Sequence, residues 1–159
     1  MATVNWGNVG NATLLLQNEL NALANGAMID SATVGEINNT NGPQLGTLWL
    51  HIDSNSNTYT AASYVDILLV PSTTPNGSGG AYPSYTTGSS YKIAASNYRV
   101  ATIYIDPAAF SAAAVNETFP NVILPSGYFK TLLINQTGFA FPSTNSSTLK
   151  FYGTPTQVQ

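Results

Sequence analysis

Hydrophobic and polar positions alternate with a period of two over most of the chain after residue 26. Short segments rich in β-branched and aromatic residues are bounded by Gly, Pro, Asn and Ser, which is typical of strands. These segments are 32–38, 45–53, 63–72, 90–96, 99–106, 119–124, 128–135, 138–142 and 148–153. No stretch of crossover-helix length separates them, so the pattern predicts an all-β fold, a jelly-roll-like β-sandwich of about eight strands.

The segment before residue 27 has a different period and predicts one short N-terminal helix. Leu16, Leu20 and Leu23 recur at i, i+4 and i+7, the spacing of one helix face. A helix this short needs a packing partner. It either covers one end of a sheet or docks on a neighbouring molecule. The candidate docking or oligomer contacts are Val4, Trp6, Leu16, Leu20 and Leu23.

The length of the chain fits one domain. Its 159 residues and 16.7 kDa are enough to bury a real core. We expect an N-terminal arm and helix over 1–27, the sandwich over 28–153 and a flexible tail over 154–159. The chain has no cysteine, which excludes disulfides and thiolate metal sites.

Residues 71–90 form a long Gly-, Pro- and Ser/Thr-rich connection. Long loops in compact domains are often functional. Tyr82, Tyr85 and Tyr91 lie in or beside this loop and form a candidate exposed binding loop, since tyrosine-rich loops on a neutral scaffold are typical of binding surfaces. The alternative is that these tyrosines pack the loop back onto the sheet.

The charge of the chain excludes two classes of partner. Only 7% of residues are charged, the net charge is −3, and Lys92, Arg99, Lys130 and Lys150 are the only bases. Four scattered cations are too few to contact a row of phosphate groups, so we expect neither nucleic-acid nor anionic-membrane binding. No apolar run approaches bilayer length, and the N-terminus lacks the features of a signal peptide. A neutral polar surface costs little to desolvate in a protein interface.

The residues that could carry chemistry are few and dispersed. His51 is the only histidine, and no nucleophile motif accompanies it. The seven carboxylates are spread along the chain, and Asp53 alone has the Ser and Asn neighbours of a cation loop. One carboxylate supplies too little charge for tight calcium binding. We therefore expect no catalytic residues, no metal site and no cofactor, and a protein that is not an enzyme.

The segment 124–141 predicts a strand with turns on both sides. Pro125 and Gly127 mark the first turn, and Gly138 marks the second. Both faces of the strand between them are mostly apolar, which predicts a central strand buried on both sides.

Five pieces of the chain resemble, in order, a set of small virion structural proteins of tailed bacteriophages. They are "ELNALANG" (19–26), "EINN" (36–39), "YVDILLVPS" (64–72), "LPSGYFKTLLINQTGF" (124–139) and "TLKFY" (148–152). Members typically read "ELNSLANG", "EIDNS", "YVELYLLPS" and "LPPGKFKLLLRNQTGVAL…GNTLKY". The chain departs from this pattern between 73 and 123.

The resemblance implies a non-enzymatic capsid decoration or cement protein that stabilises the head shell. It implies a location on the virion capsid surface after assembly in the host bacterial cytoplasm, the major capsid protein as partner, and a homo-oligomer, with a trimer favoured. The alternative function is a receptor-binding or carbohydrate-binding module of a tail or head fibre that uses the tyrosine-rich loop.

Overall fold

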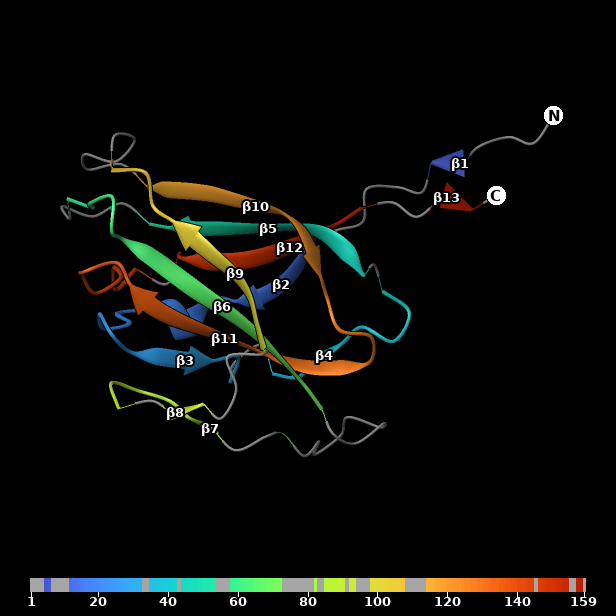
Figure 1. Ribbon diagram of the computed structural model, residues 1–159, viewed down its shortest axis with the longest axis horizontal. Coiled ribbons are helices and arrows are strands. Elements are labelled where there is room, and N and C mark those ends of the chain that lie inside the picture. The colour runs from blue at the N-terminus through green and yellow to red at the C-terminus, as the bar shows by residue number, and fades with distance from the viewer. Residues whose placement is uncertain are drawn as a thin grey trace.

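The regular structure of the chain is almost entirely β, as the computed structural model in Figure 1 shows. The structure describes residues 12–32, 35–42, 44–53, 58–72, 82, 85–90, 98–107, 114–144 and 146–154, and the backbone alone of 5–6, 92–93 and 157–158. These ranges contain no α-helix, and η1 (Asn18–Leu20) is one turn of 3-10 helix.

The first sheet has four antiparallel strands in the order β10-β5-β12-β2. Their bounds are β2 (Thr13–Leu16), β5 (Leu45–Ile52), β10 (Val115–Ile123) and β12 (Thr148–Gly153). Along β5 the alternation is strict: Leu48, Leu50 and Ile52 are fully buried, whereas the residues between them are only half-buried. One face of this sheet therefore looks into the core and the other looks away from it.

The second sheet has five antiparallel strands in the order β3-β11-β6-β9, with β4 also paired to β11. Their bounds are β3 (Met28–Asp30), β4 (Ile37–Asn38), β6 (Tyr64–Pro71), β9 (Arg99–Tyr104) and β11 (Tyr128–Gln136). Buried residues run continuously along β6 and β11, in contrast to the alternation of β5. Both faces of this sheet are thus covered over much of its area, and β11 is the central, doubly buried strand that the sequence predicts.

Two pairs of two-residue strands lie outside these sheets. β1 (Asn5–Trp6) pairs with β13 (Gln157–Val158), and β7 (Tyr85–Thr86) pairs with β8 (Lys92–Ile93). β13 lies within 154–159, the segment for which the sequence predicts a flexible tail.

The main core lies between the inner faces of the two sheets. The four-stranded sheet supplies Leu48, Leu50 and Phe151, and the five-stranded sheet supplies Ile67 and Phe129, all fully buried in one cluster. Burying an aliphatic or aromatic side chain of this kind is worth about 1.5–3 kcal/mol.

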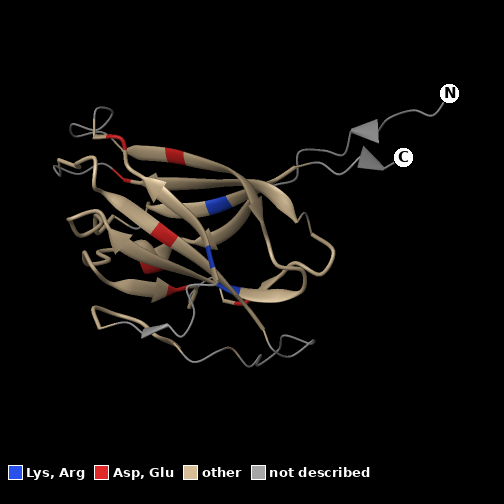
Figure 2. Cartoon of the chain, viewed as in Figure 1, with Lys and Arg blue, Asp and Glu red and all other residues tan. Residues whose placement is uncertain are grey.

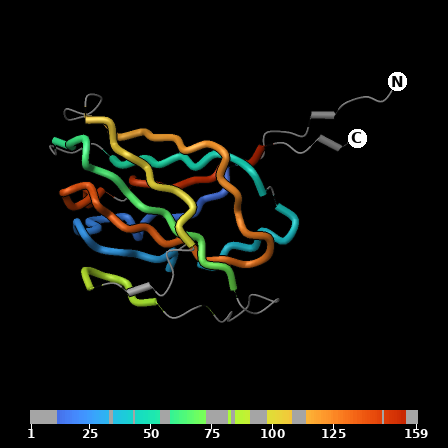
Figure 3. The backbone as a smooth tube through the Cα atoms, in the orientation of Figure 1, coloured from blue at the N-terminus to red at the C-terminus, as the bar shows by residue number. Residues whose placement is uncertain are grey.

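The strand pairings are nested along the chain. β1 pairs with β13, β2 with β12, β3 with β11, β5 with β10, β6 with β9 and β7 with β8. The chain therefore follows the path of one long hairpin whose arms are divided between two sheets. Figure 3 shows the backbone along this path, with β9 and β10 adjacent where the chain passes from one sheet to the other.

The predicted N-terminal helix is wrong. Thr13–Leu16 forms β2 at the edge of the four-stranded sheet, paired with β12, and only the single turn η1 follows. Ala22, with φ of 54°, cannot continue a right-handed helix. The leucines at helical spacing are all buried, but they do not lie on a helix face. Leu16 ends strand β2, and Leu20 and Leu23 lie in and after the turn η1. The sandwich consequently begins before residue 28.

Two other segments differ from the sequence prediction. The alternating segment 138–142 forms no strand, because the Asn135 side chain organises it as a turn. Its amide nitrogen donates to the carbonyl oxygens of Leu23 and Phe139, at 2.9 and 2.8 Å, and its oxygen accepts from Thr137. The strand expected at 119–124 begins earlier, at Val115, and a register shift between Phe119 and Val122 interrupts it.

Candidate functional site

The outer face of the five-stranded sheet is apolar at its centre and is covered by tyrosines. A second buried cluster there comprises Met28, Leu68, Val70, Leu132 and Ile134. Three half-buried tyrosines pack on this cluster, and we call them the tyrosine cover: Tyr82, Tyr85 and Tyr98. A layer of aromatic rings thus lies over side chains that would otherwise face water.

Hydrogen bonds fix two tyrosines of the cover, one to β3 and the other to Glu36, which directly precedes β4. The Tyr85 hydroxyl donates to Asp30 Oδ2 at 2.9 Å, and the Tyr82 hydroxyl donates to the Glu36 carboxylate. The backbones of Met28 and Gly88 exchange two further hydrogen bonds. Burial, followed by the hydrogen bond to a carboxylate, raises the pKa of both Tyr82 and Tyr85 well above its usual value. The phenols are therefore held in their neutral form.

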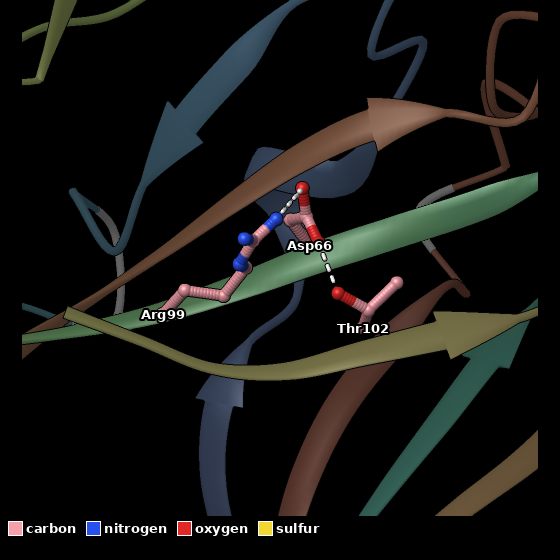
Figure 4. A network of polar contacts seen from close by, with 3 residues as sticks. All are labelled: Asp66, Arg99 and Thr102. Carbon is pink, nitrogen blue, oxygen red and sulfur yellow. Dashed lines mark hydrogen bonds and ion pairs between the residues drawn. The ribbon is translucent and has the colours of Figure 1, made fainter. Parts of the chain in front are cut away.

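Beyond the cover, the same face carries the only ion pair among the described residues. Asp66 on β6 is almost buried, and its carboxylate contacts Arg99 Nη1 at 3.3 Å and accepts a hydrogen bond from Thr102 on β9, as Figure 4 shows. The Arg99 side chain is half exposed. The pairing of β6 with β9 places Thr102 beside Asp66, which explains how the carboxylate is nearly buried.

The outer face of the four-stranded sheet has no comparable cover among the described residues. We call it the open face, the side of β2, β5, β10 and β12 that points away from the core. Its end near the start of β5 is apolar: Leu45 is 45% exposed, Ile123 67% and Tyr152 38%. Leu45 and Ile123 are direct cross-strand partners, and Tyr152 pairs with Thr47, so these side chains share one surface.

The middle of the open face carries a row of contacting polar and aromatic groups from three strands. The ring of Trp49 stacks on that of His51, with centroids 5.5 Å apart and planes 16° apart. His51 Nδ1 lies 2.9 Å from Asn116 Oδ1 on β10. On the other neighbouring strand, β12, Lys150 Nζ lies 5.1 Å from the Trp49 ring centroid. These contacts hold the indole in one orientation.

Three of the predicted N-terminal docking residues do not form a surface. Leu16 and Leu20 are fully buried in the main core, and Leu23 is nearly so. They already pack inside the domain and offer no area to a partner. Val4 and the Trp6 side chain lie outside the described residues.

The candidate binding loop is placed in part. Tyr82 and Tyr85 pack on the sheet, which is the alternative interpretation of these residues. Tyr91 and most of 73–84 lie outside the described residues.

No group of three or more metal-ligating side chains occurs in the described part of the chain. His51 belongs to the open face rather than to a cluster of acids or nucleophiles. The backbone N–H of Asp53 donates to Ser147 Oγ at 3.1 Å, and the residues of its candidate cation loop, 54–57, lie outside the description.

Leu45, Trp49, Ile123 and Tyr152 of the open face are not among the site residues that the sequence predicts. The signal was present in "LGTLWLHI", where Leu48, Leu50 and Ile52 occupy the buried positions, so that Leu45 and Trp49 must point the other way. A tryptophan on the non-core side of an alternating strand indicates a surface that something else covers.

Comparisons with known proteins identify no relative of this chain. No protein-family model, curated protein or solved structure matches it. In the described residues, no helix has the length and hydrophobicity needed to cross a membrane.

Proposed function

We propose that the chain is a non-enzymatic virion structural protein of a tailed bacteriophage, a decoration or cement protein that stabilises the head shell. The observation that supports this most is the open face, where Leu45, Ile123 and Tyr152 are exposed together on one side of a sheet. Grouped exposed apolar side chains on a rigid sheet are typical of a protein-interaction surface.

The low charge of the chain supports the same function. Charged residues are thinly spread over both sheets, as Figure 2 shows. A shell-binding protein buries its surface against neighbours, and a face built of Thr, Asn and apolar side chains loses little hydration energy in doing so. The major capsid protein is the proposed partner.

The topology also fits this function by analogy. We propose that the sandwich is a jelly roll of eight principal strands, which the nested pairing of β2 with β12, β3 with β11, β5 with β10 and β6 with β9 supports. Jelly rolls recur in viral capsid and lectin domains, so the fold alone supports a function only at the level of analogy.

Several linked copies of the chain would bind the shell firmly even if each contact were weak. We propose a homo-oligomer, with a trimer favoured, on the capsid surface. Linked copies that engage neighbouring shell subunits gain avidity by a factor of about 10²–10⁴ over one contact. A cement protein of this kind resists shell expansion because several contacts must break together.

The alternative function, a receptor- or carbohydrate-binding module that uses the tyrosine-rich loop, has less support. The hydroxyls of Tyr82 and Tyr85 donate to carboxylates of the chain itself, and their rings pack on the sheet. Two of its three candidate residues are thereby occupied within the domain.

The copy number in purified particles tests the function directly. In particles of the phage that encodes the chain, quantitative mass spectrometry should find hundreds of copies, and particles stripped of the chain should lose heat resistance while they still adsorb to the host. A dozen copies or fewer, or stripped particles of unchanged robustness, would contradict the cement function. Loss of adsorption would favour the receptor-binding alternative.

A matched pair of variants tests the surface. The double variant Leu45→Asp, Ile123→Asp places charge on the open face and should fail to rebind stripped particles. Tyr104→Asp is the control, because Tyr104 is about as exposed as Ile123, at 64% against 67%, but lies on the five-stranded sheet. Equal rebinding by both variants would show that the open face is not the docking surface.

A further inference from the structure

The chain contains two lysine–aromatic pairs, one on each outer face. Lys130 Nζ lies 5.2 Å from the Tyr82 ring centroid, and Lys150 Nζ lies 5.1 Å from the Trp49 ring centroid. Each cation is attracted to the face of its ring, and tryptophan provides the stronger of the two attractions. The two pairs are alike in geometry, so their surroundings determine what each can do.

The surroundings differ in the presence of a carboxylate. Tyr82, which lies below Lys130, donates its hydroxyl to Glu36, so an acid of the chain lies at the same ring. The outward positions of the open face contribute no Asp or Glu. They are Leu14, Leu45, Thr47, Trp49, His51, Asn116, Thr118, Ile123, Thr148, Lys150 and Tyr152.

The nearest acids in sequence belong elsewhere. Glu117 alternates with the outward residues of β10, so it lies toward the inner side, where its Oε1 accepts from the Asp106 backbone N–H. Asp53 follows the end of β5 and is bonded to Ser147 through its backbone N–H. The one ion pair of the described residues is that of Arg99 with Asp66, on the other sheet.

The indole under Lys150 is held in place before any partner arrives. His51 stacks on Trp49, and Asn116 fixes the His51 ring from the adjacent strand. A partner that contacts Lys150 therefore meets an ordered aromatic surface and loses less conformational entropy on binding.

We propose that the open face binds a carboxylate-bearing protein surface. An Asp or Glu of the partner pairs with Lys150 beside Trp49, and apolar side chains of the partner cover Leu45, Ile123 and Tyr152. The carboxylate site is independent of the proposed function, and only the identification of the partner with the head shell rests on it.

Charge complementarity favours an acidic partner over a second copy of the chain in a face-to-face pair. The whole chain has a net charge of −3, yet this face presents a cation and no acid. Two open faces pressed together by a two-fold axis would bring Lys150 and its counterpart onto one small surface with no carboxylate between them. Like charges in an interface weaken it and oppose encounter.

Two small probes of equal shape test the site on the isolated chain. 3-Phenylpropionate and its neutral amide are titrated while the Trp49 indole N–H signal is followed by NMR, with Trp6 as the internal reference. The acid should bind about threefold more tightly than the amide, the ratio expected for one exposed ion pair. Equal binding of the two probes, or no response to either, would overturn the proposal.

Variants test whether the charge of Lys150 causes the preference for the acid. Lys150→Gln should abolish the preference for the acid, and Lys150→Arg should retain it. Lys130→Gln is the matched control, because it removes the other stacked lysine, and it should leave the preference unchanged. A preference that survives Lys150→Gln would assign the acid to another site and contradict the proposal.

Particle rebinding distinguishes this proposal from the proposed function. If Lys150→Gln binds the probes without preference but rebinds stripped particles as tightly as the parent, the cement function stands and the acidic partner is wrong. If the probes discriminate but the chain is absent from particles, the carboxylate site stands and the function is wrong. Self-association that depends on Leu45 and Ile123 would make a second copy the occupant, and would likewise contradict the acidic partner.

Discussion

The two outer faces of the sandwich differ in whether other residues of the chain cover their apolar side chains. On the five-stranded sheet, Leu132 and Ile134 lie under the tyrosine cover, and the acids nearby are bonded to tyrosines or to Arg99. On the four-stranded sheet, Leu45 and Ile123 are exposed, and Lys150 lies beside Trp49 with no acid among the outward residues. Within the described residues, one face is covered by the chain itself, and the other keeps Leu45 and Ile123 exposed.

In the function that we propose, this difference is how a protein with few charges specifies one interaction surface. Apolar area on both faces would promote non-specific association. Covering one face with a segment of the same chain removes that area from solvent, so that the open face is the one we propose for docking. The comparison predicts that changes on the covered face alter stability, whereas changes on the open face alter binding.

The largest expected contrast is between two aliphatic truncations. Leu132→Ala on the covered face should lower the free energy of unfolding by about 2–5 kcal/mol, because Leu132 is fully buried and its loss leaves a cavity. Ile123→Ala on the open face should change it by less than about 0.5 kcal/mol, since the side chain is 67% exposed. Urea unfolding of both variants measures the contrast, and equal losses would show that the open face is structurally required.

The next contrast is between two tyrosines. Tyr85→Phe removes the hydrogen bond to Asp30 and should cost about 1–2 kcal/mol of unfolding free energy. Tyr152→Phe should be close to neutral, because the ring stays and the residue is exposed. Thermal or urea unfolding at neutral pH measures both changes. A neutral Tyr85→Phe would mean that packing alone holds the cover.

Alkaline pH should weaken the covered face selectively. Burial and hydrogen bonds to carboxylates raise the pKa of Tyr82 and Tyr85 in the folded chain. The unfolded chain releases these protons near pH 10. It therefore binds fewer protons than the folded chain above that pH, and the free energy of unfolding falls as the pH rises further. Unfolding measured from pH 8 to pH 11 should show this fall.

The double variant Tyr82→Phe, Tyr85→Phe is the control for the alkaline effect. It lacks both phenols, so its stability should depend less on pH above 10 than that of the parent. An unchanged dependence would assign the effect to other groups.

The smallest expected effect concerns the ion pair beyond the cover. Arg99→Gln should reduce the free energy of unfolding by less than about 1 kcal/mol, because the Arg99 side chain is half exposed and such pairs contribute little. The buried Asp66 carboxylate keeps its hydrogen bond from Thr102. Urea unfolding measures the change, and a loss of several kcal/mol would show that Asp66 depends on Arg99 for its burial.

The all-β class and most strands could be predicted from local pattern. β12 occupies the predicted 148–153, and β5, β6 and β11 differ from prediction by one residue at one or both ends. The alternation in β5 and the double burial of β11 are properties of consecutive residues, which is why the sequence reveals them.

The N-terminal segment shows where the same reasoning fails. Leu16, Leu20 and Leu23 have helical spacing, yet the core that buries them is built by strands from the rest of the chain. The edge of β12 at Lys150 and Phe151 offers hydrogen bonds that an isolated helix cannot match, so Thr13–Leu16 becomes a strand.

The sequence by itself determined the class of the fold, the central position of β11 and the neutral polar character of the surface, because these depend on local alternation and composition. Only the tertiary structure decided which outer face is covered. The hydroxyls of Tyr82 and Tyr85 bond to Glu36 and Asp30, which are 46 and 55 positions away in the sequence. Lys150 on β12 contacts Trp49 on the neighbouring strand β5, and these two strands are also far apart in the sequence. Contacts over such separations depend on the pairing of the strands, which no local pattern specifies.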